Sequence, residues 1–181
     1  MSMRPAFLHK SPPARSGGVT LIEILVAILI LSFGLLGSAG LQMAGLRAAL
    51  GANQRTTATL LAYDAADRMR ANMVAVNGAY YHNYTPTQIT SCMQTAGCSP
   101  TQMAQHDMYE WGQAIADQLP SGIGIVCRDS SPDDGTSNTS QIAAGCDGLG
   151  NIYVIKIWWL EDRSSSNPSG TLKRFATSFR P

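Results

Sequence analysis

The sequence predicts an α+β fold in which one long N-terminal helix packs on an antiparallel sheet of three or four strands. An apolar run over residues 19–41 continues into an amphipathic helical pattern that ends near residue 70. Three later segments are rich in β-branched and aromatic residues. Only turn-rich loops join these segments, which leaves no room for the crossover helix that parallel strands need.

Composition indicates a membrane segment rather than a nucleic-acid-binding domain. The 181 residues are 45% hydrophobic and 14% charged, with a formal net charge of +1. A nucleic-acid-binding surface would be strongly basic. The charges are unevenly placed, because residues 1–18 hold Arg4, Lys10 and Arg15 and no acid. Removing that segment turns the net charge of +1 into −2.

Residues 1–18 are predicted to be a leader rather than a folded element. They are basic, rich in Pro, Ser and Gly, and show no periodicity. No side chain is charged over residues 24–41, and a helix of about 20 apolar residues can cross the hydrocarbon core of a membrane. The basic flank then places the leader in the cytoplasm and everything after the helix outside. The alternative is a secretory signal cut after residues 38–40, against which stands the continuation into more helix.

The second half of this helix is predicted to pack on a globular domain through one apolar face. That face is formed by Leu46, Leu50, Leu60, Leu61, Met69 and Met73. Glycines interrupt the helix at positions 34, 37, 40, 45 and 51. They are either ordinary small residues of a membrane helix or points at which the helix bends, and the pattern favours neither.

A shorter helix is predicted from residue 100 to about residue 119. Ser99 has the position of an N-cap, Pro100 is the first helical residue, and Gln102 completes a capping box. The apolar stripe of this helix consists of Met103, Met108, Trp111, Ile115 and Leu119. The polar residues His106, Asp107 and Glu110 are assigned to its solvated face. Residues 76–98 before it form a loop, whose Tyr80, Tyr81 and Tyr84 either pack or contact other subunits.

The strands are predicted at residues 123–127, 151–160 and 173–179, with loops at 129–150 and 161–170. Trp158 and Trp159 are neighbours in the second strand and point to opposite faces of the sheet. One of them is therefore expected in the core and the other at the surface or at an interface.

The four cysteines indicate two disulfides and an oxidising compartment such as a periplasm. Four cysteines allow three connectivities, and nearness in the sequence favours Cys92–Cys98 and Cys127–Cys146. Free buried thiols are the alternative. The spacings do not match a zinc site.

Glu23 is the most informative residue, because it is an acid at the entrance to a long apolar run. A carboxylate costs about 2.5–3.5 kcal/mol near the bilayer centre and less at the interface, so such residues usually have a partner. A cut between Gly18 and Val19 would create an α-amino group one helical turn from Glu23. That amine can neutralise the carboxylate within one chain or between stacked subunits. An interfacial Glu on an uncleaved helix is the alternative.

Residues 17–23, Gly-Gly-Val-Thr-Leu-Ile-Glu, resemble the prepilin signature of the type IV pilin-like superfamily. In that signature a Gly precedes the cut and the mature chain begins Phe-Thr-Leu-Ile-Glu, so Val19 stands where Phe is usual. The resemblance implies cleavage after Gly18 by an aspartic prepilin peptidase and N-methylation of Val19. It also implies that Glu23 determines assembly, and that the fold is a pilin fold.

The resemblance extends to the PilV family of minor pilins through residues 28–42, 126–135, 146–159 and the final Phe-Arg-Pro. It implies residues 19–45 as the transmembrane and assembly helix and residues 46–181 as a periplasmic domain. The implied location is the bacterial inner membrane and then a pilus filament, at or near its tip. The implied partners are minor and major pilins, the prepilin peptidase and the inner-membrane assembly platform. A minor pseudopilin of type II secretion shares these features and is the second hypothesis.

The remaining candidates are weaker. Asp129, Asp133, Asp134 and Asp147 flank loops in the manner of calcium ligands, but the EF-hand spacing is absent and turn chemistry explains Pro-Asp-Asp-Gly. No catalytic arrangement stands out. We therefore predict that the protein is not an enzyme and that it binds no cofactor, metal or small-molecule substrate. A membrane-anchored periplasmic enzyme is the distant third hypothesis.

Overall fold

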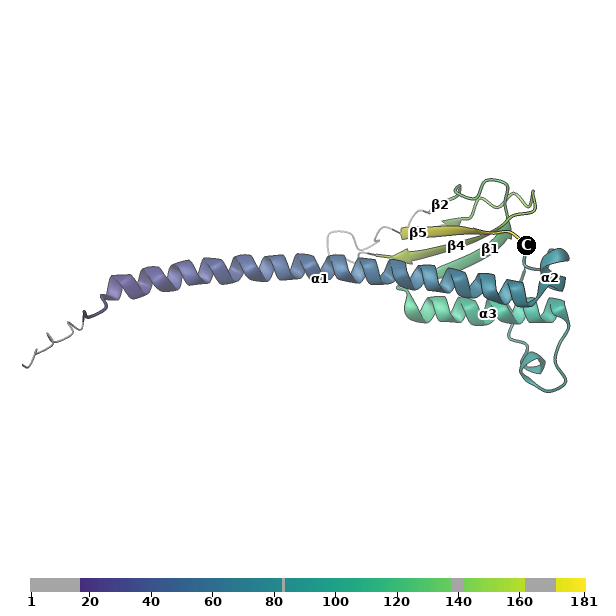
Figure 1. Ribbon diagram of the computed structural model, residues 1–181, viewed down its shortest axis with the longest axis horizontal. Helices are drawn as coiled ribbons and strands as arrows, with labels where there is room; N and C mark the ends of the chain where they lie inside the picture. Colours follow the sequence, from purple (N-terminus) through teal and green to yellow (C-terminus); the bar gives the residue numbers. More distant parts are fainter. Residues whose placement is uncertain (1–16, 83, 138–141, 162–171) are drawn as a thin grey trace, which may run out of the picture. The chain divides into compact units, whose positions relative to one another are not determined.

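The computed structural model describes residues 17–82, 84–137, 142–161 and 172–181 (Figure 1). The chain divides into two compact units, Met1–Leu46 and Arg47–Pro181, and each is described by itself. Residues 1–16 of the predicted leader and nearly all of the predicted loop 161–170 lie outside the described residues.

The described part of the first unit is the start of helix α1, which runs from Leu21 to Ala71. Every residue from 21 to 46 is exposed. Glu23 is the one charged residue within residues 17–46. By length and composition α1 can cross a membrane. A Cβ added at Gly34, Gly37 or Gly40 would meet nothing within 4 Å, so no contact with another described residue requires glycine there.

The second unit combines helices with a three-stranded antiparallel sheet of order β1-β4-β5, which confirms the predicted fold class. Its sheet strands are β1 (Ile123–Arg128), β4 (Tyr153–Leu160) and β5 (Leu172–Phe179). Its other elements are α2 (Met73–Asn77), the 3-10 helix η1 (Thr90–Met93), α3 (Pro100–Gln118), β2 (Thr136–Ser137) and β3 (Ile142–Ala143). The 3-10 helix η1 lies in the predicted loop 76–98, α2 overlaps only the first two residues of that loop, and the β2-β3 ribbon lies in the predicted loop 129–150.

The core side of α1 consists mostly of alanines, which corrects the predicted packing face. Leu46, Leu50 and Leu60 are exposed, whereas the buried residues are Ala58, Leu61, Ala62, Ala65, Ala66 and Met69. The indole nitrogen of Trp111 on α3 donates to the carbonyl of Leu61 at 2.7 Å. A large ring that lies on the backbone of α1 leaves room for small side chains only, because protein cores are close-packed.

Strand β4 is buried on both faces, which corrects the prediction that one tryptophan is exposed. Trp159 belongs to the helix-facing core, and Trp158 on the opposite face is equally buried. The two side chains do alternate, as predicted. The opposite face is covered because Lys156, which shares it with Trp158, is enclosed by the chain that follows β1.

His106 and Asp107 are buried, which corrects their assignment to a solvated face of α3. The Nδ1 atom of His106 accepts from the backbone N–H of Ile89 at 3.1 Å. The Tyr81 hydroxyl donates to Asp107 Oδ2 at 3.0 Å. Arg68 of α1 lies 3.4 Å from Asp107 Oδ1 and 3.0 Å from Glu110. The polar edge of α3 therefore faces α1 and the turn at residue 81 rather than water.

Candidate processing and assembly site

The bond between Gly18 and Val19 lies in a non-helical segment directly before α1. Residues 17–20 have no regular secondary structure, and the helix begins at Leu21. All four residues are exposed, and a Cβ added at Gly17 or Gly18 would meet nothing within 4 Å. A peptidase must hold its substrate in an extended form, and a helix does not offer that form because its backbone groups are paired internally. The segment is thus accessible where the sequence predicts the cut.

Thr20 caps the first turn of α1, a role that the sequence analysis missed. Its hydroxyl oxygen accepts from the backbone N–H of Glu23 at 3.4 Å, and its carbonyl accepts from the N–H groups of Glu23 and Ile24. The signal that could have found this role is the spacing of Thr20 and Glu23, which is that of a capping box. Thr20 therefore fixes where the helix starts, two residues after the predicted cut.

The side chain of Glu23 is available for a partner outside the chain. The residue is exposed, and its carboxylate makes no ion pair or hydrogen bond with any residue that the structure describes. It lies in the first turn of α1, where the helix dipole favours a negative charge. Val19 precedes it by four residues, two of which, Val19 and Thr20, lie before the first residue of the helix.

The apolar side chains that follow Glu23 are exposed in the single chain. Leu25, Leu29, Phe33 and Leu36 are each more than half exposed. A single chain in water does not leave so many adjacent apolar residues uncovered without a use for them. Lipid or the helices of other subunits can cover this surface.

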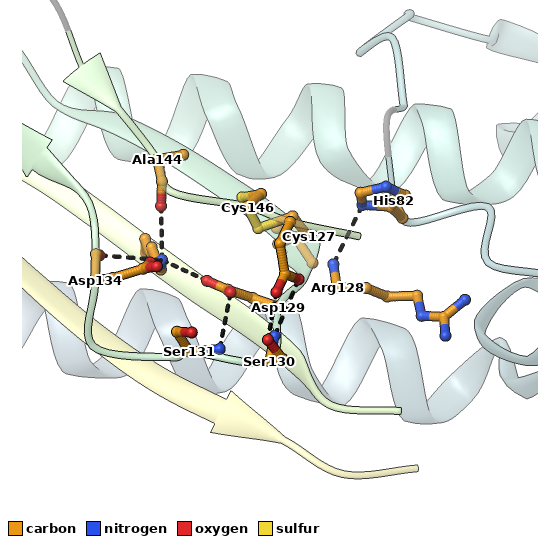
Figure 2. Close-up of a disulfide and its surroundings, with 12 residues drawn as sticks. His82, Cys127, Arg128, Asp129, Ser130, Ser131, Asp134, Ala144 and Cys146 are labelled. Atoms are coloured by element: carbon orange, nitrogen blue, oxygen red, sulfur yellow. Dashed lines mark hydrogen bonds and ion pairs between the residues drawn. A yellow bond between two sulfur atoms is a disulfide. The ribbon is translucent and has the colours of Figure 1, made fainter. Parts of the chain in front are cut away.

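Two disulfides stabilise the second unit. The structure pairs Cys92 with Cys98, and Cys127 with Cys146, with Cα–Cα distances of 4.8 and 6.1 Å. This is the connectivity that nearness in the sequence favours. The first bridge closes a short loop at η1, and the second holds the chain after β3 against the end of β1 (Figure 2).

The acids considered for calcium have partners of their own. Asp129 and Asp134 pair with Lys156, and Asp133 pairs with Arg174 at 2.9 Å. Asp147 accepts from the backbone N–H groups of Ser130 and Leu149 and from the Ser130 hydroxyl. Within the described residues, no group of three or more His, Cys, Asp or Glu side chains could hold a metal ion.

Comparison with known families supports the class of protein that this site and fold define, the type IV pilin superfamily. Residues 13–39 match the prokaryotic N-terminal methylation motif. Residues 40–109 match the family described as Type IV pilin Tt1218. No curated protein and no solved structure matches the chain. The pilin match favours a structural, non-enzymatic role, and implies contact with other pilins and with a prepilin peptidase.

Proposed function

We propose that this chain is a minor pilin of a type IV pilus, of the PilV kind, that primes or modifies pilus assembly. Residues 1–18 are a leader that the prepilin peptidase removes between Gly18 and Val19, with methylation of the new terminus. Residues 19–45 then anchor the subunit in the inner membrane and later pack in the filament. Residues 46–181 form the periplasmic domain.

One observation carries this proposal. The exposed apolar part of α1 is preceded by an exposed, non-helical Gly18–Val19 bond and by a capped helix start. Its first turn carries Glu23, whose carboxylate has no partner among the described residues. An ordinary membrane anchor needs the apolar helix alone and gains nothing from an acid at its entrance. A subunit that must leave lipid for a filament needs a directional contact as well.

The contact that we propose is between the Glu23 carboxylate and the Val19 amine of a neighbouring subunit. The attraction between two unit charges grows as the surroundings become less polar. In a helix bundle within or near lipid, the pair therefore stabilises one axial register between subunits. A subunit with an unsatisfied carboxylate in that bundle would be disfavoured, since an unpaired buried charge is costly.

A type II secretion pseudopilin is the second candidate, because it would share the N-terminal motif and the fold. The last cysteine is Cys146, which favours a minor over a major pilin subunit but does not separate a minor pilin from a pseudopilin. Neighbouring genes discriminate the two: minor pilin genes support the pilus assignment, and secretion genes support the other.

Mass spectrometry of the N-terminus tests the processing step. In cells with an active prepilin peptidase, the purified chain is expected to begin at Val19, with a methyl group on its amine. Replacing Gly18 with Val is expected to leave the leader in place, and replacing Gly17 with Ala is the matched control that is still cut. A mature chain that begins after residue 40 would show instead that the apolar run is a secretory signal.

Substitution of Glu23 tests the assembly step. Glu23→Val is expected to be cut normally but to be absent from sheared filaments, because the cut depends on Gly18 and the packing depends on the carboxylate. Asp117→Asn, which changes an exposed acid of α3, is the control and is expected to assemble. Wild-type amounts of Glu23→Val in filaments would contradict the assembly role and leave the membrane-anchored enzyme to be considered.

A further inference from the structure

Lys156 is a charged residue buried on the face of β4 that points away from the helices. Its side chain has no solvent exposure, and neither has that of Asp129, whose Oδ2 atom lies 2.7 Å from the ammonium nitrogen. The ammonium also donates to Asp134 Oδ1 at 3.0 Å, to the carbonyl of Asp134 at 3.1 Å and to the carbonyl of Ala144 at 2.6 Å. Four oxygen atoms from Asp129, Asp134 and Ala144 therefore surround one nitrogen, and Figure 2 shows these three residues beside one another.

The oxygen atoms are held in place independently of Lys156. Asp129 directly follows β1, and its Oδ1 atom accepts from the backbone N–H of Ser131 at 3.0 Å. Ala144 is two residues from Cys146, which the disulfide ties to Cys127. Arg174 on β5 donates to the carbonyl oxygens of Asp133 and Gly135. These contacts do not involve Lys156, and they hold the chain on either side of each oxygen atom of the cage.

Two carboxylates and two carbonyls that converge on one point are oxygen ligands of the kind that Ca²⁺ takes, and water would have to complete the six to eight ligands that this ion needs. The cage holds two negative charges, and without a positive charge at its centre the buried carboxylate of Asp129 would be unpaired, at a high cost. A side chain as long as lysine reaches the centre from β4 and supplies that charge. Removing the ammonium would leave the same oxygen atoms around an empty space.

We propose that Lys156 is a tethered internal cation that fills an oxygen cage of the divalent-metal type. It joins residues 129, 134 and 144 to β4 without any bound metal. These three residues therefore keep their positions whatever the concentration of divalent cations outside the cell membrane. Replacement of Lys156 by a small residue converts the cage into a site for Ca²⁺.

Thermal unfolding of the processed full-length protein in detergent, with EDTA or with millimolar CaCl₂, tests this proposal. The wild-type Tm is expected to be the same in both. Lys156→Ala is expected to lower the Tm in EDTA by on the order of 10 °C, because a buried charge loses its partner. Calcium is expected to restore much of that loss, and the double variant Lys156→Ala/Asp129→Asn is expected not to respond to calcium. Lys173→Ala, which removes a half-exposed lysine of β5, is the matched control with no calcium response.

Several results would overturn the proposal. They are a calcium-dependent Tm of the wild type, an unchanged Tm of Lys156→Ala in EDTA, and a failure of calcium to stabilise that variant. If Lys156→Ala does not fold, amide hydrogen exchange of the loop in the wild-type protein tests the proposal instead. Slower exchange on adding calcium would contradict the proposal. A mass of the intact protein lower by one water than the sequence predicts would indicate an amide bond between Lys156 and Asp129. That result would also overturn the proposal, because an amide nitrogen carries no charge.

Discussion

At the scale of single residues, the contacts of Tyr81 and Asp107 show how buried polar groups join α1, α3 and the turn between them. Burial raises the pKa of the Asp107 carboxyl, while the Tyr81 hydroxyl and the Arg68 guanidinium lower it and so keep the anion acceptable. Burial also raises the pKa of the Tyr81 hydroxyl, and the charge of Asp107 raises it further. Tyr81 therefore stays a hydrogen-bond donor over the whole physiological range.

The Tyr81 hydroxyl makes the domain less stable at alkaline pH. Above the ordinary tyrosine pKa of 10.0, the unfolded chain releases the Tyr81 proton and the folded chain keeps it. The folded state then binds more protons, so the free energy of unfolding decreases as the pH rises. Tyr81→Phe is expected to be less stable than wild type at pH 7, since Asp107 loses a donor, by about 1–3 kcal/mol. The difference is expected to shrink above pH 10 in urea unfolding curves recorded at several pH values.

Tyr80→Phe is the matched control for this prediction, because Tyr80 is the neighbouring tyrosine in the chain and its side chain is exposed. It is expected to leave both the stability at pH 7 and the alkaline loss unchanged. A wild-type alkaline loss that persists in Tyr81→Phe would assign the effect to another group.

At the scale of elements, α3 shows how local sequence signals define a helix. The Ser99 hydroxyl accepts from the backbone N–H of Gln102 at 3.3 Å, and the Gln102 side chain accepts from the N–H of Ser99 at 3.0 Å. Pro100 at the first helical position loses nothing by lacking an N–H. The two reciprocal hydrogen bonds fix where α3 starts, and with it the position of Trp111 against α1.

Ser99→Ala is expected to destabilise the domain by about 1 kcal/mol, because it removes one of the two capping hydrogen bonds. For a domain of this size the Tm is expected to fall by about 2–4 °C in thermal unfolding followed by circular dichroism. Ser99→Asp keeps an acceptor at the N-cap and is expected to remain close to wild type. Equal losses in the two variants would mean that the cap does not contribute.

Local signals predicted most elements, and long-range contacts account for what they missed. The helix around Ser99, the strands and the start of α1 follow from capping, periodicity and β-propensity, which act over a few residues. The buried Asp107 contacts Arg68 and Tyr81, and the buried His106 contacts Ile89, and all three partners are remote in the sequence. The burial of Lys156 depends on a loop whose path no local pattern gives. In the candidate site, Gly18 and Glu23 followed from the motif, and the cap at Thr20 was visible as spacing but was not used.

At the scale of the whole molecule, the core is confined to the second unit. The buried hydrophobic residues run from Ala58 to Phe179, and none lies in residues 17–46. The interactions that fold the domain are therefore separate from those that the exposed helix makes with lipid or with other subunits.

A chain of residues 47–181 is expected to fold without detergent and to melt within about 3 °C of the full chain, because it retains every buried contact. A chain of residues 67–181 is the control, and it is expected to be unfolded because it lacks Ala58, Leu61, Ala62 and Ala65 of the core. Circular dichroism and gel filtration measure both. Unfolding of the longer chain would show that residues 17–46 contribute to the core after all.

The buried Lys156 also has a consequence for how the sheet finds its register. Strand β4 is apolar on both faces, so hydrophobic burial alone barely distinguishes the native pairing from one shifted by a single residue. In the shifted pairing, Lys156 would enter the helix-facing core, among alanines and aromatic rings that offer its ammonium no acceptor. That error is costly, because an unpaired buried charge is costly. The lysine therefore makes the shifted pairing less stable than the native one, which hydrophobic burial alone would not do.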